Sequence, residues 1–335
     1  MKKILSATVA VVVAALAGMM TPSHAEVSVV RLAKQYGIGY LPLTIMEERR
    51  LFEKHAAAMG LTVKTEWLRF SAGSGMNDAL LSDSLDIAAG GVAPMLTLWA
   101  RTRANLQVKG IAALSSMPLY LVTVNPKINS LADFGAGDKI ALPGIKTSIQ
   151  AVTLQMAAGK QFGQGQEARL DSLTVSMGHP DAQLTMLGGR SGISAHFSSP
   201  PFQNLELKEA QVKKVVDSYD VLGGPHTFTV VWAGNKFVQA NPTVMKAFMA
   251  ALSESEEFIK KHPADAAKIW ASVEKTGLSE DDTTKMITDP SFDWTMTPER
   301  ILPYLTFMHG AGLVKETTKD WRDLFFPYVH DRLGS

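Results

Sequence analysis

Residues 67–94 alternate short apolar runs with glycine-rich loops, and this stretch constrains the fold more than any other part of the chain. In order, the residues predict a strand at 67–70, a Ser/Gly loop at 71–75, a helix, a second strand at 85–89, a glycine pair and a helix that starts at Pro94. A glycine-rich loop between a strand and a helix exposes backbone N–H groups and the positive end of the helix dipole. The pattern favours binding of a small anion, although Ser/Gly loops also serve as plain helix N-caps.

The same alternation precedes this stretch. A β-rich run at 27–33 leads into a loop at 36–42 that contains two glycines and two aromatic residues, and a helical stretch follows at 43–59. A further strand is expected at 61–70. Alternating strands and helices predict a mostly parallel sheet with its ligand at the carboxyl ends of the strands.

A second unit of similar construction is predicted after residue 116. A strand at 108–114 is broken by Ser115–Pro118, and an apolar run at 119–124 then resumes with a different partner available. Within this unit a strand at 139–142, a loop at 143–148 and a helix at 149–159 repeat the first plan. We therefore expect lobe I to comprise residues 26–116 and 228–335, and lobe II to comprise residues 117–227, with a signal peptide at 1–25.

The chain is expected to return to lobe I after a Gly/Pro loop at 219–226. A strong strand follows at 227–233. Asn241–Pro242 begins a helix with one apolar face, which ends near His262–Pro263. The remaining residues keep a helical periodicity, with helix caps predicted at Ser279 and at Thr297–Pro298.

The N-terminal 25 residues have the pattern of a secretory signal peptide. Lys2 and Lys3 precede an apolar run from Ile4 to Met20, and small residues at Ser23 and Ala25 indicate cleavage after Ala25. A membrane anchor is the competing interpretation, but the run is short for a spanning helix. We expect export and a free mature protein.

Composition excludes several classes of function. The chain contains no cysteine, which excludes disulfides, thiolate metal sites, a cysteine nucleophile and a lipid-anchor cysteine. Loss of residues 1–25 removes two lysines and no acidic residue, so 33 basic and 32 acidic residues become 31 and 32. A net charge of about −1 argues against nucleic acid as a partner.

Enzyme motifs are also missing from the sequence. It has no HExxH motif, no phosphate-loop GxxxxGK[ST], and no GxSxG around Ser74, because Ala72 stands where a glycine is required. The eight histidines lack metal-ligand spacing, and a GxGxxA-like run at 163–168 follows a helix rather than a strand. We expect no catalytic residue, no metal and no cofactor.

Lys146 is the cation best placed for an anionic headgroup, since it lies between Gly144 and a predicted helix start, with Thr147 and Ser148 as neutral donors. A solvated surface lysine is the competing interpretation. Arg69 is interpreted as a surface partner of Glu66, and His179, beside a proline, as a turn residue.

The order of several short motifs resembles one known family across nearly all of residues 26–330. The motifs are GYLPL (39–43), FSAGSG (70–75), SLDIAAGGVAP (84–94), HFSSPPF (196–202), NP (241–242), GLVK (312–315) and DWRDLF (320–325). They resemble the nitrate/sulfonate/taurine class of ABC-transporter periplasmic substrate-binding proteins, which is related in fold to thiamine-pyrimidine synthases.

This resemblance implies an α/β fold of two lobes, each a mixed or mostly parallel sheet flanked by helices, hinged by two crossing segments in the manner of a type II periplasmic binding protein. The related synthases use a cysteine-rich segment, which this chain lacks. The implied partners are a small solute and an inner-membrane ABC permease with its ATPase, and the protein is expected to be a monomer.

Residues from the glycine loops, the second loop and the family-like motifs form the expected ligand site. The predicted contacts are Tyr40, Leu41, Ser71, Gly73, Ser74, Gly75, Gly90, Gly91, Lys146, Thr147, Ser148, His196, Phe197, Ser198 and His226. A sulfonate, nitrate or carboxylate is the favoured solute, with Tyr40, Phe197 and Phe202 available to hold an apolar body. A pyrimidine or other neutral solute is the alternative, as is an exported subunit that senses its ligand rather than transporting it.

Overall fold

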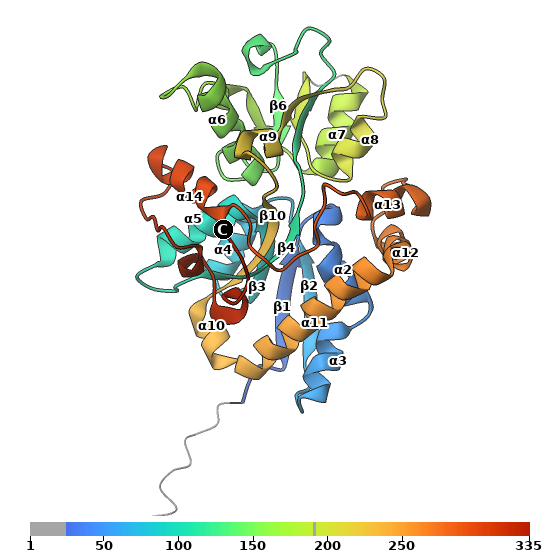
Figure 1. Ribbon diagram of the computed structural model, residues 1–335, viewed down its shortest axis with the longest axis vertical. Coiled ribbons are helices and arrows are strands. Elements are labelled where there is room, and N and C mark those ends of the chain that lie inside the picture. Colours follow the sequence, from blue (N-terminus) through green and yellow to red (C-terminus); the bar gives the residue numbers. More distant parts are fainter. Residues whose placement is uncertain (1–24, 190–191) are drawn as a thin grey trace, which may run out of the picture.

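Two five-stranded sheets, each flanked by helices, form two lobes arranged along the long axis of the molecule (Figure 1). The structure is a computed structural model, which describes residues 25–189 and 192–335. The predicted signal peptide lies outside the described residues, except for Ala25. None of the helices in the described ranges combines the length and apolar character needed to cross a membrane.

The sheet of lobe I has four strands that run in one direction and a fifth, inserted between two of them, that runs in the opposite direction. Its order is β2 (Lys64–Arg69), β1 (Val29–Lys34), β3 (Ile87–Gly91), β10 (Thr227–Ala233) and β4 (Lys109–Ser116). β1 pairs in parallel with β2 and β3, whereas β10 runs antiparallel to both β3 and β4. The carboxyl ends of β1, β2 and β3 therefore lie at the same edge of the sheet.

The sheet of lobe II repeats this arrangement. Its order is β7 (Thr174–Ser176), β6 (Ile140–Leu142), β8 (Ala195–Phe197), β5 (Tyr120–Thr123) and β9 (Lys213–Asp217). β6 pairs in parallel with β7 and β8, and β5 runs antiparallel to β8 and β9. The expected fold class, two mixed sheets flanked by helices, is confirmed.

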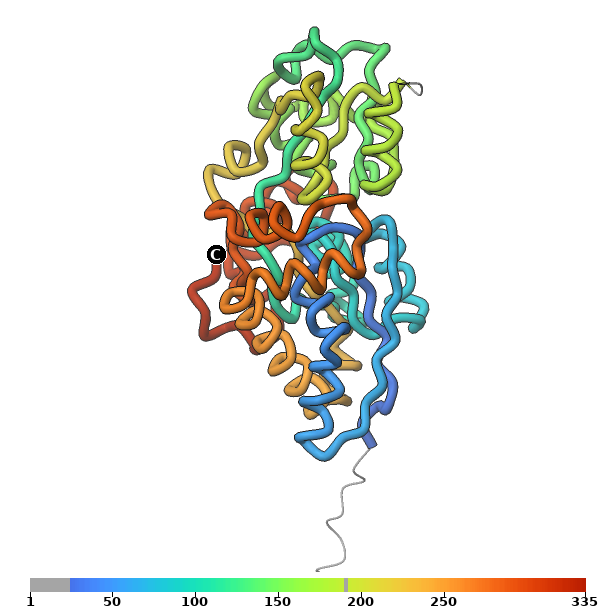
Figure 2. The backbone as a smooth tube through the Cα atoms, turned by 90° about the vertical axis from the view of Figure 1, so that its right-hand side faces the viewer, coloured from blue at the N-terminus to red at the C-terminus, as the bar shows by residue number. Residues whose placement is uncertain are grey.

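Helices cover both sheets, and the segment after α11 lies at the level where the lobes meet (Figure 2). The helices of lobe I are α2 (Leu41–Glu48), α3 (Leu51–Ala58), α4 (Gly73–Leu81), α5 (Val92–Thr102), α10 (Asn235–Ala240), α11 (Pro242–Lys261), α12 (Pro263–Val273), α13 (Glu280–Ile287) and α14 (Ile301–Gly310). Those of lobe II are α6 (Ile149–Phe162), α7 (His179–Gly188), α8 (Phe202–Glu206) and α9 (Ser218–Leu222).

Several sequence expectations on these elements are confirmed. β10 occupies the predicted residues, and α11 begins at Pro242 and buries an apolar face that includes Val244, Phe248 and Ile259. Ser279 caps α13 because its side chain accepts a hydrogen bond from the backbone N–H of Asp282.

Four local expectations are wrong. The helix expected over 43–59 is divided by Arg50, whose φ of 50° ends α2 and starts α3. The loop at 71–75 is shorter than expected because α4 already begins at Gly73, and the expected loop at 219–226 contains part of α9. Thr297–Pro298 caps no helix; Arg300, also at φ 50°, precedes α14.

The chain passes between the sheets twice, from β4 to β5 and from α9 to β10, and a hydrogen-bonded row joins the two passages. The hydroxyl of Ser218 accepts from the backbone N–H of Leu119 at 2.8 Å and lies 2.8 Å from Nε2 of His226. Nδ1 of His226 lies 3.0 Å from the carbonyl of Thr227, to which it donates. Burial disfavours the charged ring, so the imidazole is neutral, and with its hydrogen on Nδ1 its Nε2 accepts from the Ser218 hydroxyl.

We expect this buried histidine to make the fold sensitive to acid. Burial lowers the pKa of His226 to about 4. Its folded-state pKa lies below the unfolded value, so the stabilisation is present above about pH 6.5 and is lost as the pH falls toward 4. The free energy of unfolding should fall by about 3 kcal/mol from about pH 7 to about pH 4 through His226 alone.

Urea titrations of the wild type and of His226→Gln at several pH values measure this contribution. Between about pH 4 and about pH 6.5 the unfolding free energy of the wild type should rise more steeply with pH than that of the variant, by the slope that corresponds to about one bound proton. An unchanged slope would contradict the assignment.

Candidate ligand-binding site

A small cavity lies between the two lobes and is lined from both. Its lining residues are Gln35, Tyr36, Tyr40, Gly73, Gly91, Pro94 and Phe228 from lobe I, with Pro143, Ser148, Ile149, Gln150 and His179 from lobe II. The cavity measures about 20 Å³, which is space for about one water molecule. A small-molecule pocket usually measures hundreds of Å³, so a solute can enter only when the lobes move apart.

Four helices begin at this cavity. Lobe I contributes the starts of α4 and α5 through Gly73 and Gly91, which lie at or next to the first helical residue. Lobe II contributes the starts of α6 and α7 through Ser148 and His179. α2 follows the lining residue Tyr40, but its first N–H, that of Leu41, already donates to the carbonyl of Ile38. Each free helix N-terminus carries unpaired N–H groups and a partial positive charge, so the four ends together create a positive potential in the cavity.

The lining side chains add polar groups but no formal charge. Among the described residues, no Asp, Glu, Lys or Arg side chain lines the cavity. The hydroxyl of Ser148 accepts from the backbone N–H of Ala151 at 3.1 Å, which leaves its own hydrogen available as a donor. Gln150 and His179 supply further hydrogen-bonding groups from the same lobe.

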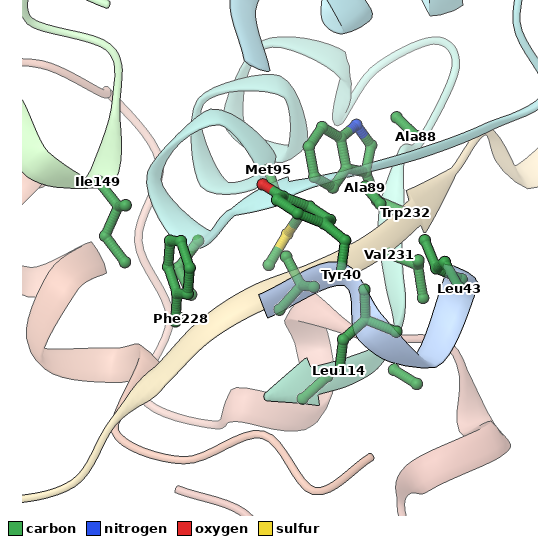
Figure 3. Packing of buried hydrophobic residues seen from close by; sticks show 14 of the residues in the cluster. Tyr40, Leu43, Ala88, Ala89, Met95, Leu114, Ile149, Phe228, Val231 and Trp232 are labelled. Carbon is green, nitrogen blue, oxygen red and sulfur yellow. The ribbon is translucent and has the colours of Figure 1, made fainter. Parts of the chain in front are cut away.

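The opposite wall is aromatic and apolar. The rings of Tyr40 and Phe228 meet edge to face with centroids 6.4 Å apart. Burial raises the pKa of the Tyr40 phenol, so Tyr40 stays neutral. Ile149 reaches from α6 toward this wall beside Phe228 (Figure 3). The site therefore combines an apolar wall with a ring of hydrogen-bond donors.

His179 connects the cavity with the interior of lobe II. Its Nε2 lies 3.2 Å from Nε2 of Gln150, and its Nδ1 lies 2.8 Å from Nε2 of His196. Nδ1 of His196 lies 2.6 Å from Oε1 of Glu206. Burial, reinforced by the neighbouring His196, lowers the pKa of His179 well below the usual value, so this imidazole is neutral at physiological pH.

Four of the sequence-predicted residues line the cavity, and four others are one or two positions along the chain from a lining residue. Tyr40, Gly73, Gly91 and Ser148 line it. Gly90 lies behind the wall, where a Cβ would meet Gln35 and Trp232. Ser74, Gly75 and Thr147 are half-buried and do not line the cavity.

The other predicted residues are not at the cavity. Leu41 and Phe197 are buried in the apolar core, and Ser198 is buried beside β8. His196 reaches the site only through His179, and His226 holds the crossing described above. Ser71 is exposed, although it lies across the lobe boundary from Gly178, whose Cβ position is 3.5 Å from the Ser71 side chain.

Lys146 points away from the cavity. Its backbone φ is 60°, its side chain is 61% exposed, and its ammonium lies 4.0 Å from the carboxylate of Asp171. We expect Lys146→Ala to leave solute affinity within about twofold of the wild type, because an exposed pair contributes little. Calorimetric titration of the wild type and of Lys146→Ala with solute measures the affinity, with Thr147→Ala as the control at the neighbouring residue. A tenfold loss of affinity in Lys146→Ala would show that Lys146 contacts the solute.

The sequence reasoning missed Gln35, Tyr36, Gln150 and His179. Tyr36 belongs to the predicted aromatic loop, and Gln150 follows the predicted cap Ser148, so both positions carried a signal. Arg69, interpreted as a partner of Glu66, instead pairs with Glu274 and lies over the ring of Tyr36 at 5.0 Å. Its positive charge is thus held just outside the cavity. No cluster of three metal-ligating side chains occurs within residues 25–189 and 192–335.

Solved structures show where this fold occurs. The alkanesulfonate-binding protein SsuA from Xanthomonas axonopodis pv. citri, bound to MOPS, matches with a TM-score of 0.68 and 17% identity, covering 87% of this chain and 93% of that one. The periplasmic aliphatic sulphonate binding protein SsuA from Escherichia coli matches with a TM-score of 0.65 and 17% identity, covering 90% and 92%.

The periplasmic nitrate-binding protein NrtA from Synechocystis PCC 6803 also matches, with a TM-score of 0.65 and 14% identity, covering 89% of this chain and 88% of that one. At these identities the likeness establishes the fold, which is that of two-lobed periplasmic binding proteins. Comparison with curated proteins finds no match.

The sequence itself identifies the family. Residues 71–266, more than half of the 335-residue chain, match the family described as NMT1/THI5 like. This segment contains all of lobe II and all the cavity-lining residues except Gln35, Tyr36 and Tyr40. The chain belongs to the NMT1/THI5-like family.

Proposed function

We propose that this protein is the solute-binding component of an ABC import system. It captures a small organic anion, of sulfonate, nitrate or carboxylate type, between its lobes and delivers it to a membrane permease. The observation that carries the proposal is the meeting of four helix N-termini from both lobes at one cavity without a charged side chain in the described lining. The SsuA and NrtA proteins that share the fold bind alkanesulfonates and nitrate.

The mechanism is a shift in population between open and closed lobes. Lobe I and lobe II each offer helix N-termini, so a bound anion contacts both and stabilises the closed state. The protein does no chemistry on its solute, works in the periplasm as a monomer after cleavage behind Ala25, and presents surfaces of both lobes to the permease. Recovery of the solute chemically unchanged after incubation supports binding over catalysis.

A neutral pyrimidine is the second candidate, and the aromatic wall of Tyr36, Tyr40 and Phe228 favours it. The two candidate solutes would bind to different parts of the cavity. An anion uses the helix ends, whereas a neutral ring uses the aromatic wall.

A thermal-shift assay decides between them. The purified protein is heated with ethanesulfonate, nitrate, benzoate or an uncharged aminopyrimidine, each at millimolar concentration. An anion at about 100 times its Kd should stabilise the protein by about 2.7 kcal/mol and raise the Tm. A rise with the aminopyrimidine alone selects the second candidate, and no rise with any of the four rejects the ligand classes proposed.

A further inference from the structure

A row of four hydrogen-bonded side chains leads from the cavity into the interior of lobe II. Gln150 and His179 line the cavity, His196 lies behind them, and Glu206 ends the row. Each side chain comes from a different element of lobe II: in order along the row these are α6, α7, β8 and α8. The ring of Phe202 stacks on His179 at a centroid distance of 5.5 Å and fixes the plane of the imidazole.

The inner end of this row is completely enclosed. His196 and Glu206 are both 0% exposed, and Oε2 of Glu206 has no hydrogen-bond partner among the described residues. No Lys or Arg side chain pairs with Glu206 in the part of the chain that the structure describes. A buried carboxylate without a cationic partner is costly, so the proton content of this row matters energetically.

With Glu206 as a carboxylate throughout, hydrogen-bond counting allows the row two arrangements, which differ by one proton. In the first, Glu206 is a carboxylate and His196 is neutral, with Nδ1–H donating to Glu206. Nε2 of His196 must then accept from Nδ1–H of His179. Nε2 of His179 is consequently an acceptor, to which the amide NH₂ of Gln150 donates at the cavity wall, and the row carries one negative charge.

In the second arrangement the row holds one more proton. A proton enters at Nε2 of His179, and the Nδ1 proton of His179 moves to Nε2 of His196. His196 is then an imidazolium paired with the Glu206 carboxylate, and His179 is neutral in its other tautomer, with its hydrogen on Nε2. The row is now uncharged overall. The amide of Gln150 turns over so that its oxygen accepts from Nε2–H of His179, which frees its NH₂ as a donor at the cavity.

We propose that Glu206 and His196 are positioning residues that hold one exchangeable proton and thereby set, through the tautomer of His179, whether the Gln150 amide is free to offer its NH₂ or its oxygen to the cavity. An anion can bind only the protonated row, which offers a donor and no net charge. A solute that itself donates a hydrogen bond selects the deprotonated row. The ligand part of this inference rests on the proposed function, whereas the coupled tautomer switch does not.

The other groups that face His179 do not change the net charge or the proton count of the row. Gln150 on α6 and Phe202 on α8 carry no charge, and His196 on β8 belongs to the row. Across the cavity lie Tyr36 and the neutral phenol of Tyr40. In the pH range where the free row loses its proton, anion affinity should fall by up to tenfold for each unit of rise in pH.

Long-range ¹H–¹⁵N spectra of the histidine rings in the purified, ligand-free protein test the switch from about pH 5 to about pH 9. His179 should carry its hydrogen on Nε2 at the acidic end and on Nδ1 at the alkaline end, and His196 should lose a proton over the same interval. His226 is the internal control, because its contacts with Thr227 and Ser218 keep its hydrogen on Nδ1 throughout.

The isosteric variant Glu206→Gln removes the negative charge and should abolish the joint transition, so that both rings keep one form across the range. His179 keeping one tautomer in the wild type overturns the proposal, as does titration of His179 or His196 independently of the other. If Glu206→Gln does not fold, the wild-type spectra still decide. A tautomer switch without any thermal shift from anions retains this inference and rejects only the proposed ligand class.

Discussion

Gly91→Ala is expected to weaken solute binding by about 10- to 100-fold while leaving the fold intact. Gly91 ends β3 at the cavity, and a Cβ built there lies 2.7 Å from Cγ2 and 2.9 Å from Cβ of Ile149 in the other lobe. Its φ of −64° suits any residue, so the backbone is not strained by the change. The added methyl group therefore acts on closure alone, at about 1–3 kcal/mol.

A double variant supplies the control. Ile149→Ala removes the atoms that the new methyl group would meet, so Gly91→Ala/Ile149→Ala should recover part of the affinity that Gly91→Ala loses. Gly90→Ala makes the opposite comparison, because a Cβ there lies 2.8 Å from Nε2 of Gln35 and 2.9 Å from Trp232, both within lobe I, and should lower the Tm rather than act through contact with the other lobe. Calorimetric titration and thermal unfolding of the four proteins separate the two effects. Equal affinity of Gly91→Ala and the wild type would contradict closure across this contact.

Glu256→Gln is expected to stabilise the protein by about 3 kcal/mol at about pH 7 and to have little effect at about pH 4. Glu256 lies on the buried face of α11, is 6% exposed, and its Oε1 has no hydrogen-bond partner among the described residues. Burial raises its pKa to about 8, even though Lys260 and Arg332 favour the charged form. The folded state therefore keeps the carboxyl protonated where the unfolded chain would ionise.

Because the folded-state pKa of Glu256 lies above the unfolded value, the unfolding free energy falls as the pH rises between the two values. The stability is fully present below about pH 4.5 and is lost as the pH rises to about 8. Glutamine keeps the shape and cannot ionise, so it removes this loss. Glu257→Gln is the matched control, because Glu257 is exposed on the same helix and paired with Lys261; its effect should stay below about 1 kcal/mol. Urea unfolding at both pH values measures the difference, and equal effects of the two variants would contradict the burial argument.

The alternation of strands, loops and helices predicted the architecture well, because periodicity reports which face of an element is buried. The glycine loops at Gly73 and Gly91 and the cap Ser148 reach the cavity for the same reason: strand ends and helix starts gather at one edge of a parallel sheet. The similar order of the two sheets was also visible as a repeated strand, loop and helix plan.

Side-chain direction in loops could not be predicted in the same way. Lys146 adopts a left-handed backbone conformation that turns its side chain toward Asp171. The residues around it gave no basis for predicting this positive φ. His179 looked like a turn residue beside Pro180, yet as the first residue of α7 it reaches both the cavity and His196. Its partners are 17 and 29 residues away, a pairing that only the tertiary fold creates.

The location of the bound solute tests the central claim most directly. The cavity between the lobes is smaller than two grooves on lobe I, one of about 430 Å³ beside Trp99 and Arg103 and one of about 310 Å³ beside Phe237. A crystal structure of the protein with the anion that gives the largest thermal shift should show it between the lobes, against Ser148, His179 and the start of α5. Electron density for the anion in either groove, with the cavity between the lobes unchanged, would contradict the account.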